Sequence, residues 1–150
     1  MCETLLRDLP PEPSGARLLP MKAVKGCALG GIETSHELTL VRLIDAEDLG
    51  AVGQDTWLVQ SPSSDYPLTR RWGHAIRRIA PWCQGLVWRS RKEPKSLAYV
   101  FFSDRQPSAS TPPFMEVATG NPNARPLSFE TAEGEAYLRE ILVRYSVALS

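Results

Sequence analysis

A serine between two arginines is the part of this sequence best suited to chemistry. Arg89, Ser90 and Arg91 close a short apolar run, where a predicted strand ends and a turn begins. Strand ends and their adjoining loops commonly carry binding sites. The arginine fork can also hold a phosphate group through two parallel hydrogen bonds. The pattern therefore indicates a site for a phosphate-bearing ligand, and the alternative is that these arginines form a solvated face.

The arginines belong to a basic stretch in a chain whose total charge is balanced. The 150 residues contain 17 Lys and Arg and 17 Asp and Glu, so the formal net charge is zero. Residues 67–95, the basic stretch, hold eight bases and one acid, whereas residues 1–66 hold five bases and ten acids. The zero total argues against a general nucleic-acid coat or a polybasic membrane anchor. A nucleic-acid-binding module that uses the basic stretch alone stays open as an alternative function.

Other catalytic and metal-binding patterns are missing from the sequence. His36 and His74 form no HxxxH or HExxH pair, and Cys2, Cys27 and Cys83 form no CxxC pair. We therefore expect no metal ion and three reduced thiols. The sequence also contains no GxSxG nucleophile elbow and no GxxxxGK[ST] or GxGxxG phosphate-binding loop.

The elements that must position Ser90 follow from the hydrophobic pattern. The aliphatic runs Leu38–Ile44 and Leu97–Phe102 predict two buried strands, and Gly85–Arg91 predicts a strand between them. Thr69–Ala80 predicts a helix, because Trp72, Ala75, Ile76 and Ile79 recur at helical spacing. These residues are expected to form a single apolar face.

Helices are also predicted at both ends of the chain. Glu3–Leu9 places apolar residues on one helical face, and the C-terminal residues form an apolar stripe (Leu138, Ile141, Leu142, Tyr145 and Leu149). Glu135 and Arg139, like Glu140 and Arg144, are spaced to form ion pairs along the last helix. Only two residues precede Glu3 and none caps the helix, so we expect that an N-terminal part is missing.

Loops and one further helix complete the predicted fold. Asp45 is expected to cap a short helix that ends at Gly53. Residues 11–20 are expected to form a loop, and residues 103–127 a long surface connection with one strand over Phe114–Ala118. Short strands with interspersed helices indicate an α+β (mixed α/β) fold, and 150 residues suit a single domain.

The composition indicates a globular cytoplasmic protein. Hydrophobic residues make up 43% of the chain and charged residues 23%, which argues against disorder, collagen and coiled coil. The sequence contains no apolar run near the roughly 20 residues that a membrane helix needs. Its first residues also lack the basic and apolar regions of a signal peptide.

Three segments together resemble the RES domain, a family named for Arg, Glu and Ser residues. They are Asp65–Trp72 (DYPLTRRW), Gly85–Arg91 (GLVWRSR) and Glu3–Asp8 (ETLLRD). Family members typically show a tyrosine and a Thr-Arg or Thr-Gln pair that opens a helix. A strand then follows whose residues are, in order, Gly, two apolar residues, an aromatic residue, one residue of any type, Ser and Arg. The likeness covers nearly all of the chain, and the Ser-Arg strand is its most specific part.

The resemblance implies a fold, a substrate and a partner. RES domains resemble ADP-ribosyltransferases, so it implies an ADP-ribosyltransferase-like core with short strands and interspersed helices. Characterised members are toxins of bacterial toxin–antitoxin pairs. They deplete NAD by phosphorolysis or glycohydrolysis, or ADP-ribosylate a target, and a small helix-turn-helix-type antitoxin usually blocks their active site. NAD as substrate and such an antitoxin as partner are therefore expected, and a homo-oligomer stays open.

The resemblance also assigns roles to three residues. Glu3 matches the family glutamate, whose carboxylate would stabilise positive charge as the glycosidic bond breaks. Ser90 matches the family serine, which would hold the nicotinamide amide or the ribose of NAD. Arg91, next to it, would contact the pyrophosphate.

The chain departs from the family pattern at its beginning. The family arginine and its associated tyrosine lie upstream of the glutamate, and only two residues stand before Glu3. The NAD site is therefore expected to be incomplete in this chain and its activity impaired. The alternative function is a non-catalytic interaction module that binds a helix-turn-helix antitoxin-like partner.

Overall fold

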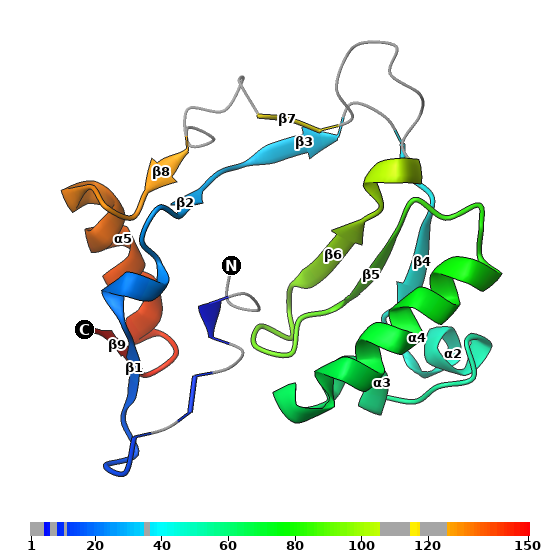
Figure 1. The fold of residues 1–150 in the computed structure, drawn as a ribbon, viewed down its shortest axis with the longest axis horizontal. Helices are drawn as coiled ribbons and strands as arrows, with labels where there is room; N and C mark the ends of the chain where they lie inside the picture. The colour runs from blue at the N-terminus through cyan, green and yellow to red at the C-terminus, as the bar shows by residue number, and fades with distance from the viewer. Residues whose placement is uncertain (1–4, 7–8, 11, 35–36, 106–114, 118–125) are drawn as a thin grey trace. The chain divides into compact units, whose positions relative to one another are not determined.

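Helices and strands form two compact units in this chain (Figure 1). The computed structural model describes residues 5–6, 9–10, 12–34, 37–105, 115–117 and 126–150. The terminal unit consists of Met1–Ser35 and Met115–Ser150, and the central unit of His36–Phe114. Both units contain helices and strands, which confirms the mixed α+β class.

The central unit is built on a three-stranded sheet. The strands are β4 (Leu40–Leu43), β5 (Gly85–Arg89) and β6 (Leu97–Phe101). β5 lies in the middle, parallel to β4 and antiparallel to β6. All three strands fall within the predicted runs, because each has a local apolar signal.

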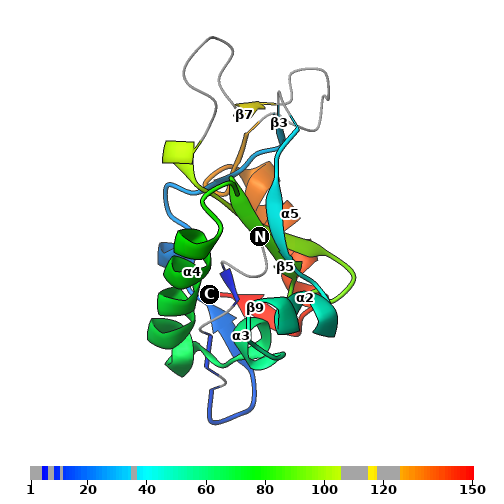
Figure 2. The same ribbon diagram turned by 90° about the vertical axis from the view of Figure 1, so that its right-hand side faces the viewer.

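Helices connect the two parallel strands, as parallel pairing requires. In chain order they are α2 (Ala46–Ala51), α3 (Trp57–Gln60), the 3-10 turn η2 (Ser63–Asp65) and α4 (Tyr66–Ile79). Figure 2 views this unit from the side. The buried core combines side chains from the sheet, the helices and the turn after α4 (Val41, Leu43, Leu49, Leu58, Ile76, Ala80, Cys83 and Leu86).

The ends of α2 confirm the predicted cap and stop. The Asp45 carboxylate accepts a hydrogen bond of 3.0 Å from the backbone N–H of Asp48. Gly53 has a φ of 70°, a left-handed conformation that glycine adopts without strain. By contrast, α4 begins at Tyr66, three residues before the predicted start, and Pro67 stands in its first turn. Proline suits that position because the first N–H groups of a helix have no partner inside it.

Arg105 closes the other end of α4. Its guanidinium donates to the carbonyl oxygens of Arg77 at 2.7 Å, Ala80 at 2.9 Å and Cys83 at 3.2 Å. The last carbonyl groups of a helix have no partner inside it, so this side chain satisfies groups that would otherwise need water. Arg105 follows β6, in the 3-10 turn η3 (Ser103–Arg105).

The prediction that Leu97–Phe102 is a buried strand was wrong in one respect. Leu97, Tyr99 and Val100 are 40%, 50% and 39% exposed. Among the described residues, β6 pairs only with β5, so it forms the edge of the sheet. Its apolar composition reflects strand propensity more than burial.

The terminal unit pairs strands that lie far apart in the sequence. β1 (Arg17–Leu19) runs parallel to β9 (Val147–Leu149). The antiparallel pairs are β2 (Ala28–Leu29) with β8 (Leu127–Ser128), and β3 (Ile32–Thr34) with β7 (Met115–Val117). The 3-10 turn η1 (Met21–Ala23) and α5 (Ala132–Val143) complete it. Its buried core combines residues from both ends of the chain (Leu6, Leu19, Val24, Phe129, Leu138, Leu142, Val147 and Leu149).

Predictions for this unit met with mixed success. β7 confirms the strand expected over Phe114–Ala118. The ion pairs of α5 also form, with N–O distances of 2.7 Å for Arg139–Glu135 and 3.0 Å for Arg144–Glu140. The loop expected over residues 11–20 was wrong at β1.

The last predicted helix was too long. α5 ends at Val143, Ser146 adopts a φ of 54°, and the chain then enters β9. Leu149 therefore belongs to a strand, although it remains a buried member of the core. The expected helix over Glu3–Leu9 lies largely outside the described residues.

Candidate functional site

Ser90 lies directly after β5 and is buried, with 5% of its surface exposed. Its backbone N–H donates to the carbonyl of Ser96 at 2.9 Å. Its side-chain Oγ accepts a hydrogen bond of 3.0 Å from the backbone N–H of Glu93. The hydroxyl is therefore held in place by the turn that joins β5 to β6, where sequence analysis placed the end of a strand.

Arg91 connects this turn to the helical side of the central unit. Its Nη1 donates to the carbonyl oxygen of Ser61 at a distance of 2.7 Å. Ser61 is the C-cap residue of α3 and is itself buried. This bond engages one nitrogen, and a guanidinium carries five N–H donors in all. The side chain thus has a structural contact at the position where the resemblance implies a pyrophosphate ligand.

The other arginines of the basic stretch divide into two groups. Arg77 forms an ion pair with Asp104, and its guanidinium lies 4.8 Å from the centre of the Phe102 ring. The Arg70 guanidinium lies 4.9 Å from the Tyr66 ring. Both contacts stabilise the fold. Arg71, by contrast, is exposed on α4 beside a groove.

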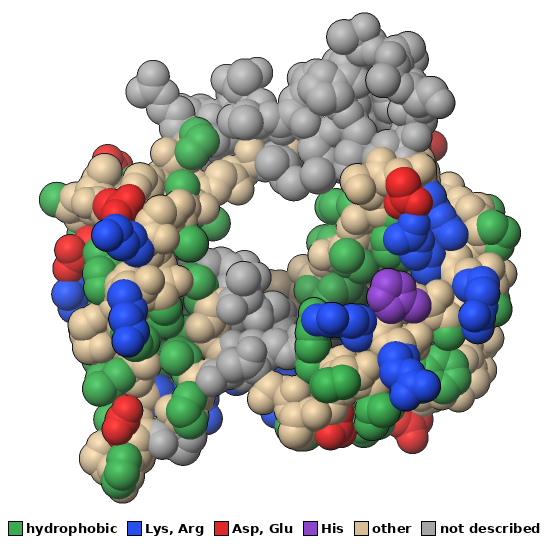
Figure 3. Space-filling model, in the orientation of Figure 1, with side chains coloured by type: hydrophobic (Ala, Val, Ile, Leu, Met, Phe, Trp, Pro, Cys, Tyr) green, Lys and Arg blue, Asp and Glu red, His purple; other side chains and the backbone are tan. Residues whose placement is uncertain are grey.

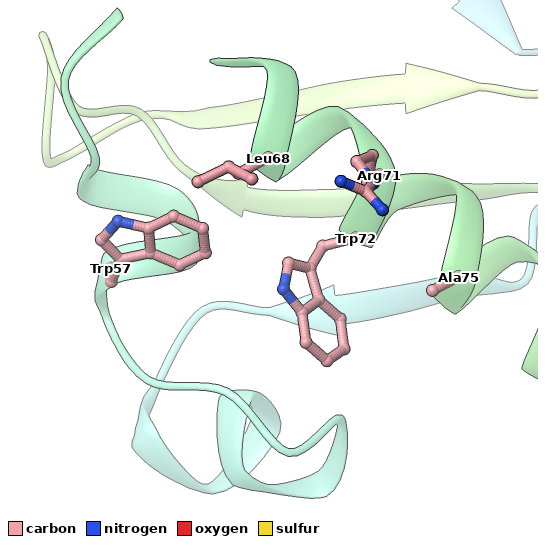
Figure 4. Close-up of a pocket in the computed structure, with 5 residues that line it drawn as sticks. All are labelled: Trp57, Leu68, Arg71, Trp72 and Ala75. Carbon is pink, nitrogen blue, oxygen red and sulfur yellow. The ribbon is translucent and has the colours of Figure 1, made fainter. Parts of the chain in front are cut away.

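The groove lies between α3 and α4 and has a volume of about 350 Å³. Its lining side chains are mostly apolar (Trp57, Leu68, Arg71, Trp72 and Ala75). Figure 4 shows Leu68 reaching from α4 toward Trp57 of α3. The Trp57 indole N–H donates to the Asp65 carboxylate at 2.8 Å, which fixes this wall of the groove.

Sequence analysis missed this groove because it identified the apolar face of the helix but not which residues of that face are covered. Ile76 is buried, whereas Ile79 is 65% exposed. Trp72 is half-buried and lines the groove. Helical periodicity identifies residues that share a face, but it does not show how far the sheet covers that face.

The remaining candidate residues lie partly outside the described part of the chain. Glu3, Cys2 and His36 lie outside the described residues. His74 is exposed on α4. Among the described residues, no group of three or more His, Cys, Asp or Glu side chains could hold a metal ion. Within the same part of the chain, no helix has the length and apolar character needed to cross a membrane.

The comparison with known families decides what kind of domain this is. The RES domain family model matches residues 1–121. The chain belongs to the RES domain family. The match contains the whole central unit together with Glu3, Ser90 and Arg91, and it confirms the resemblance seen in the sequence. Neither a curated protein nor a solved structure matches the chain, so the ADP-ribosyltransferase-like core stays a prediction.

Proposed function

We propose that this RES domain binds and degrades NAD as the toxin of a toxin–antitoxin pair in the cytoplasm. The observation that carries the proposal is the family match over the segments that hold Glu3, Ser90 and Arg91. The burial of Ser90 at the end of β5 gives it further support, because a preorganised hydroxyl orients a ligand without first being ordered.

The proposed reaction breaks the bond between the ribose C1′ and the nicotinamide nitrogen. The bonding electrons leave with the nicotinamide, which becomes neutral, and positive charge develops on the ribose. The Glu3 carboxylate would stabilise that charge. An oxygen of water, phosphate or a protein side chain then bonds to C1′ and loses its proton. Glycohydrolysis, phosphorolysis and ADP-ribosyl transfer differ only in this acceptor.

The direct test is NAD consumption by the natural full-length protein that contains these residues. Purified protein is incubated with NAD alone, with added inorganic phosphate, and with added protein as an acceptor, and the products are identified by mass spectrometry. We expect free nicotinamide together with ADP-ribose, its phosphate ester or an ADP-ribosylated protein. Intact NAD under all three acceptor conditions would contradict the proposed function.

Replacing Ser90 with alanine should reduce NAD consumption. Losing one well-placed hydrogen bond to the reacting part of the substrate is expected to cost about 10-fold to 100-fold in kcat/KM. The variant also loses the acceptor of the Glu93 N–H, so its thermal unfolding must be compared with that of Ser63→Ala, an exposed serine of η2. Unchanged kcat/KM in a folded Ser90→Ala variant would remove Ser90 from the site.

Replacing Arg91 should act mainly on NAD binding. If the guanidinium contacts the pyrophosphate, Arg91→Ala should raise the KM for NAD about tenfold and change kcat less. Arg17→Ala, at an exposed position of β1, is the control. The bond to Ser61 gives Arg91 a structural role as well, so unfolding is measured in parallel. An unchanged KM for NAD would mean that Arg91 has only the structural role.

The proposed partner is a small helix-turn-helix-type antitoxin that covers the NAD site. The proposal rests on the family, and the test is co-purification with the product of a neighbouring small gene. That product should inhibit NAD consumption when it is added back in equimolar amount. A bound product that leaves the activity unchanged would argue against blockage of the site.

A further inference from the structure

Exposed apolar side chains continue the α3–α4 groove along and beyond α4. Leu68, Ile79 and Trp82 are 49%, 65% and 60% exposed. With Trp72 and Ala75 of the groove, Leu68 and Ile79 occupy positions 68, 72, 75 and 79, which is the three- and four-residue spacing of one helical face, and Trp82 lies in the turn after α4. We call these five residues, together with Trp57, the α4 stripe. Single exposed apolar residues are common, but contiguous ones mark interaction sites.

Basic side chains border the α4 stripe. Arg70, Arg71, His74 and Arg78 are all exposed on the same helix. Figure 3 shows Lys and Arg side chains gathered around the histidine on this face of the central unit. Within the described part of the chain, the ion pairs do not include Arg71 or Arg78. An apolar row with unpaired basic neighbours is complementary to an apolar face edged by carboxylates.

The shape and charge of the surface favour one kind of occupant. A second copy of this chain that docked through the same surface would place arginines against arginines. A nucleic acid would match the charge but would leave the exposed Trp82 and Ile79 without apolar contacts. A concave groove with tryptophan walls fits the convex side of a helix better than it fits a flat bilayer. Helices that bind in grooves present apolar residues at positions i, i+3 or i+4, and i+7.

We propose that the α4 stripe docks an amphipathic helix of a partner protein, with Asp or Glu residues along the side of its apolar face that meets these basic residues. The inference rests on the proposed function only in that a protein partner exists, and it names the surface that such a partner would use. It requires no NAD chemistry. Binding can therefore succeed or fail independently of NAD consumption.

The test uses a synthetic helical peptide as the probe. The peptide carries Leu at positions i, i+3, i+4 and i+7 with Glu at the flanking positions, and a fluorophore reports binding by anisotropy in the absence of NAD. Reversing charge with Arg71→Glu or Arg78→Glu should weaken binding about tenfold or more. Removing an apolar anchor with Ile79→Ala should weaken it by a similar factor. Lys95→Glu, an exposed reversal in the β5–β6 turn, is the control and should leave binding unchanged.

Three outcomes would overturn the proposal. A peptide with the same composition but scrambled apolar positions that binds equally well would show charge attraction alone. Duplex DNA or anionic vesicles that bind more tightly than the peptide, and lose binding in the same variants, would assign the stripe to another class of ligand. Concentration-dependent dimerisation that Ile79→Ala abolishes would assign it to a second copy. All four variants change exposed side chains, so circular dichroism should show folded protein in each case.

Discussion

Glu3→Gln should nearly abolish NAD consumption in the natural full-length protein. Glutamine keeps the size of the side chain and removes its negative charge, so substrate can still bind while the developing positive charge loses its partner. Removing one such electrostatic contact from a preorganised site lowers kcat by about 10²-fold to 10³-fold. The KM for NAD should change little, because positive charge reaches the ribose only as the glycosidic bond breaks, so the lost interaction is made in the transition state and not with bound NAD.

The measurement is steady-state release of nicotinamide over a range of NAD concentrations. Glu12→Gln is the matched control, since Glu12 is an exposed glutamate of the same N-terminal segment and its hydrogen bonds with Gly15 and Ala16 use only its backbone. We expect Glu12→Gln to retain full activity. If both variants retain full activity, Glu3 is not the catalytic carboxylate. If both lose activity equally, the effect comes from the net charge of the segment and the assignment also fails.

The largest expected effect on stability comes from replacing a glycine, Gly134, with alanine. Gly134, in the first turn of α5, lies against the chain that leaves β8. A Cβ atom at this position would stand 1.9 Å from the carbonyl oxygen of Ser128 and 2.7 Å from its carbonyl carbon. The obstacle is backbone that also pairs with β2, so it cannot rotate away as a side chain would. Gly134→Ala should therefore lower the free energy of unfolding by about 3 kcal/mol, through overpacking of a closed contact.

Gly73 provides a matched control for this substitution. It also lies in a helix, α4, and a Cβ atom there would meet nothing within 4 Å. Gly73→Ala should raise the free energy of unfolding by about 0.5–1 kcal/mol, because alanine has the higher helix propensity. Urea unfolding followed by circular dichroism measures both variants. A Gly134→Ala protein as stable as the parent would mean that α5 and β8 do not approach as closely as described.

The parts of the fold that were predicted correctly are indicated by residues that lie close together in the sequence. The three central strands are each rich in apolar residues, and Asp45 combines a capping side chain with Asp48 three residues later. The parallel pair β1–β9 has no such signal. It joins Arg17–Leu19 to Val147–Leu149, and each three-residue strand exists only because the other end of the chain supplies its partner. No window of sequence contains both strands.

The candidate site was predictable to a similar extent. The family resemblance, and not the local pattern, selected Glu3 and Ser90. The end of β5 could be located to within two residues, since the predicted strand ran to Arg91 and β5 ends at Arg89. The bonds that hold Ser90 and the bond from Arg91 to Ser61 could not, because they depend on how a turn folds and on a residue 30 positions away. The groove escaped notice because tryptophan on a helical face is ordinarily a core residue.

The cap that Arg105 places on α4 has a consequence for the order of folding. The carbonyls that it satisfies, among them those of Arg77 and Ala80, belong to the end of α4, whereas Arg105 reaches them only after the chain has passed through β5 and β6. The last turn of α4 thus stays frayed while the hairpin is unformed, and it closes when the hairpin docks. Helix and hairpin complete one another in a single cooperative step, so neither is expected to persist as a stable intermediate without the other.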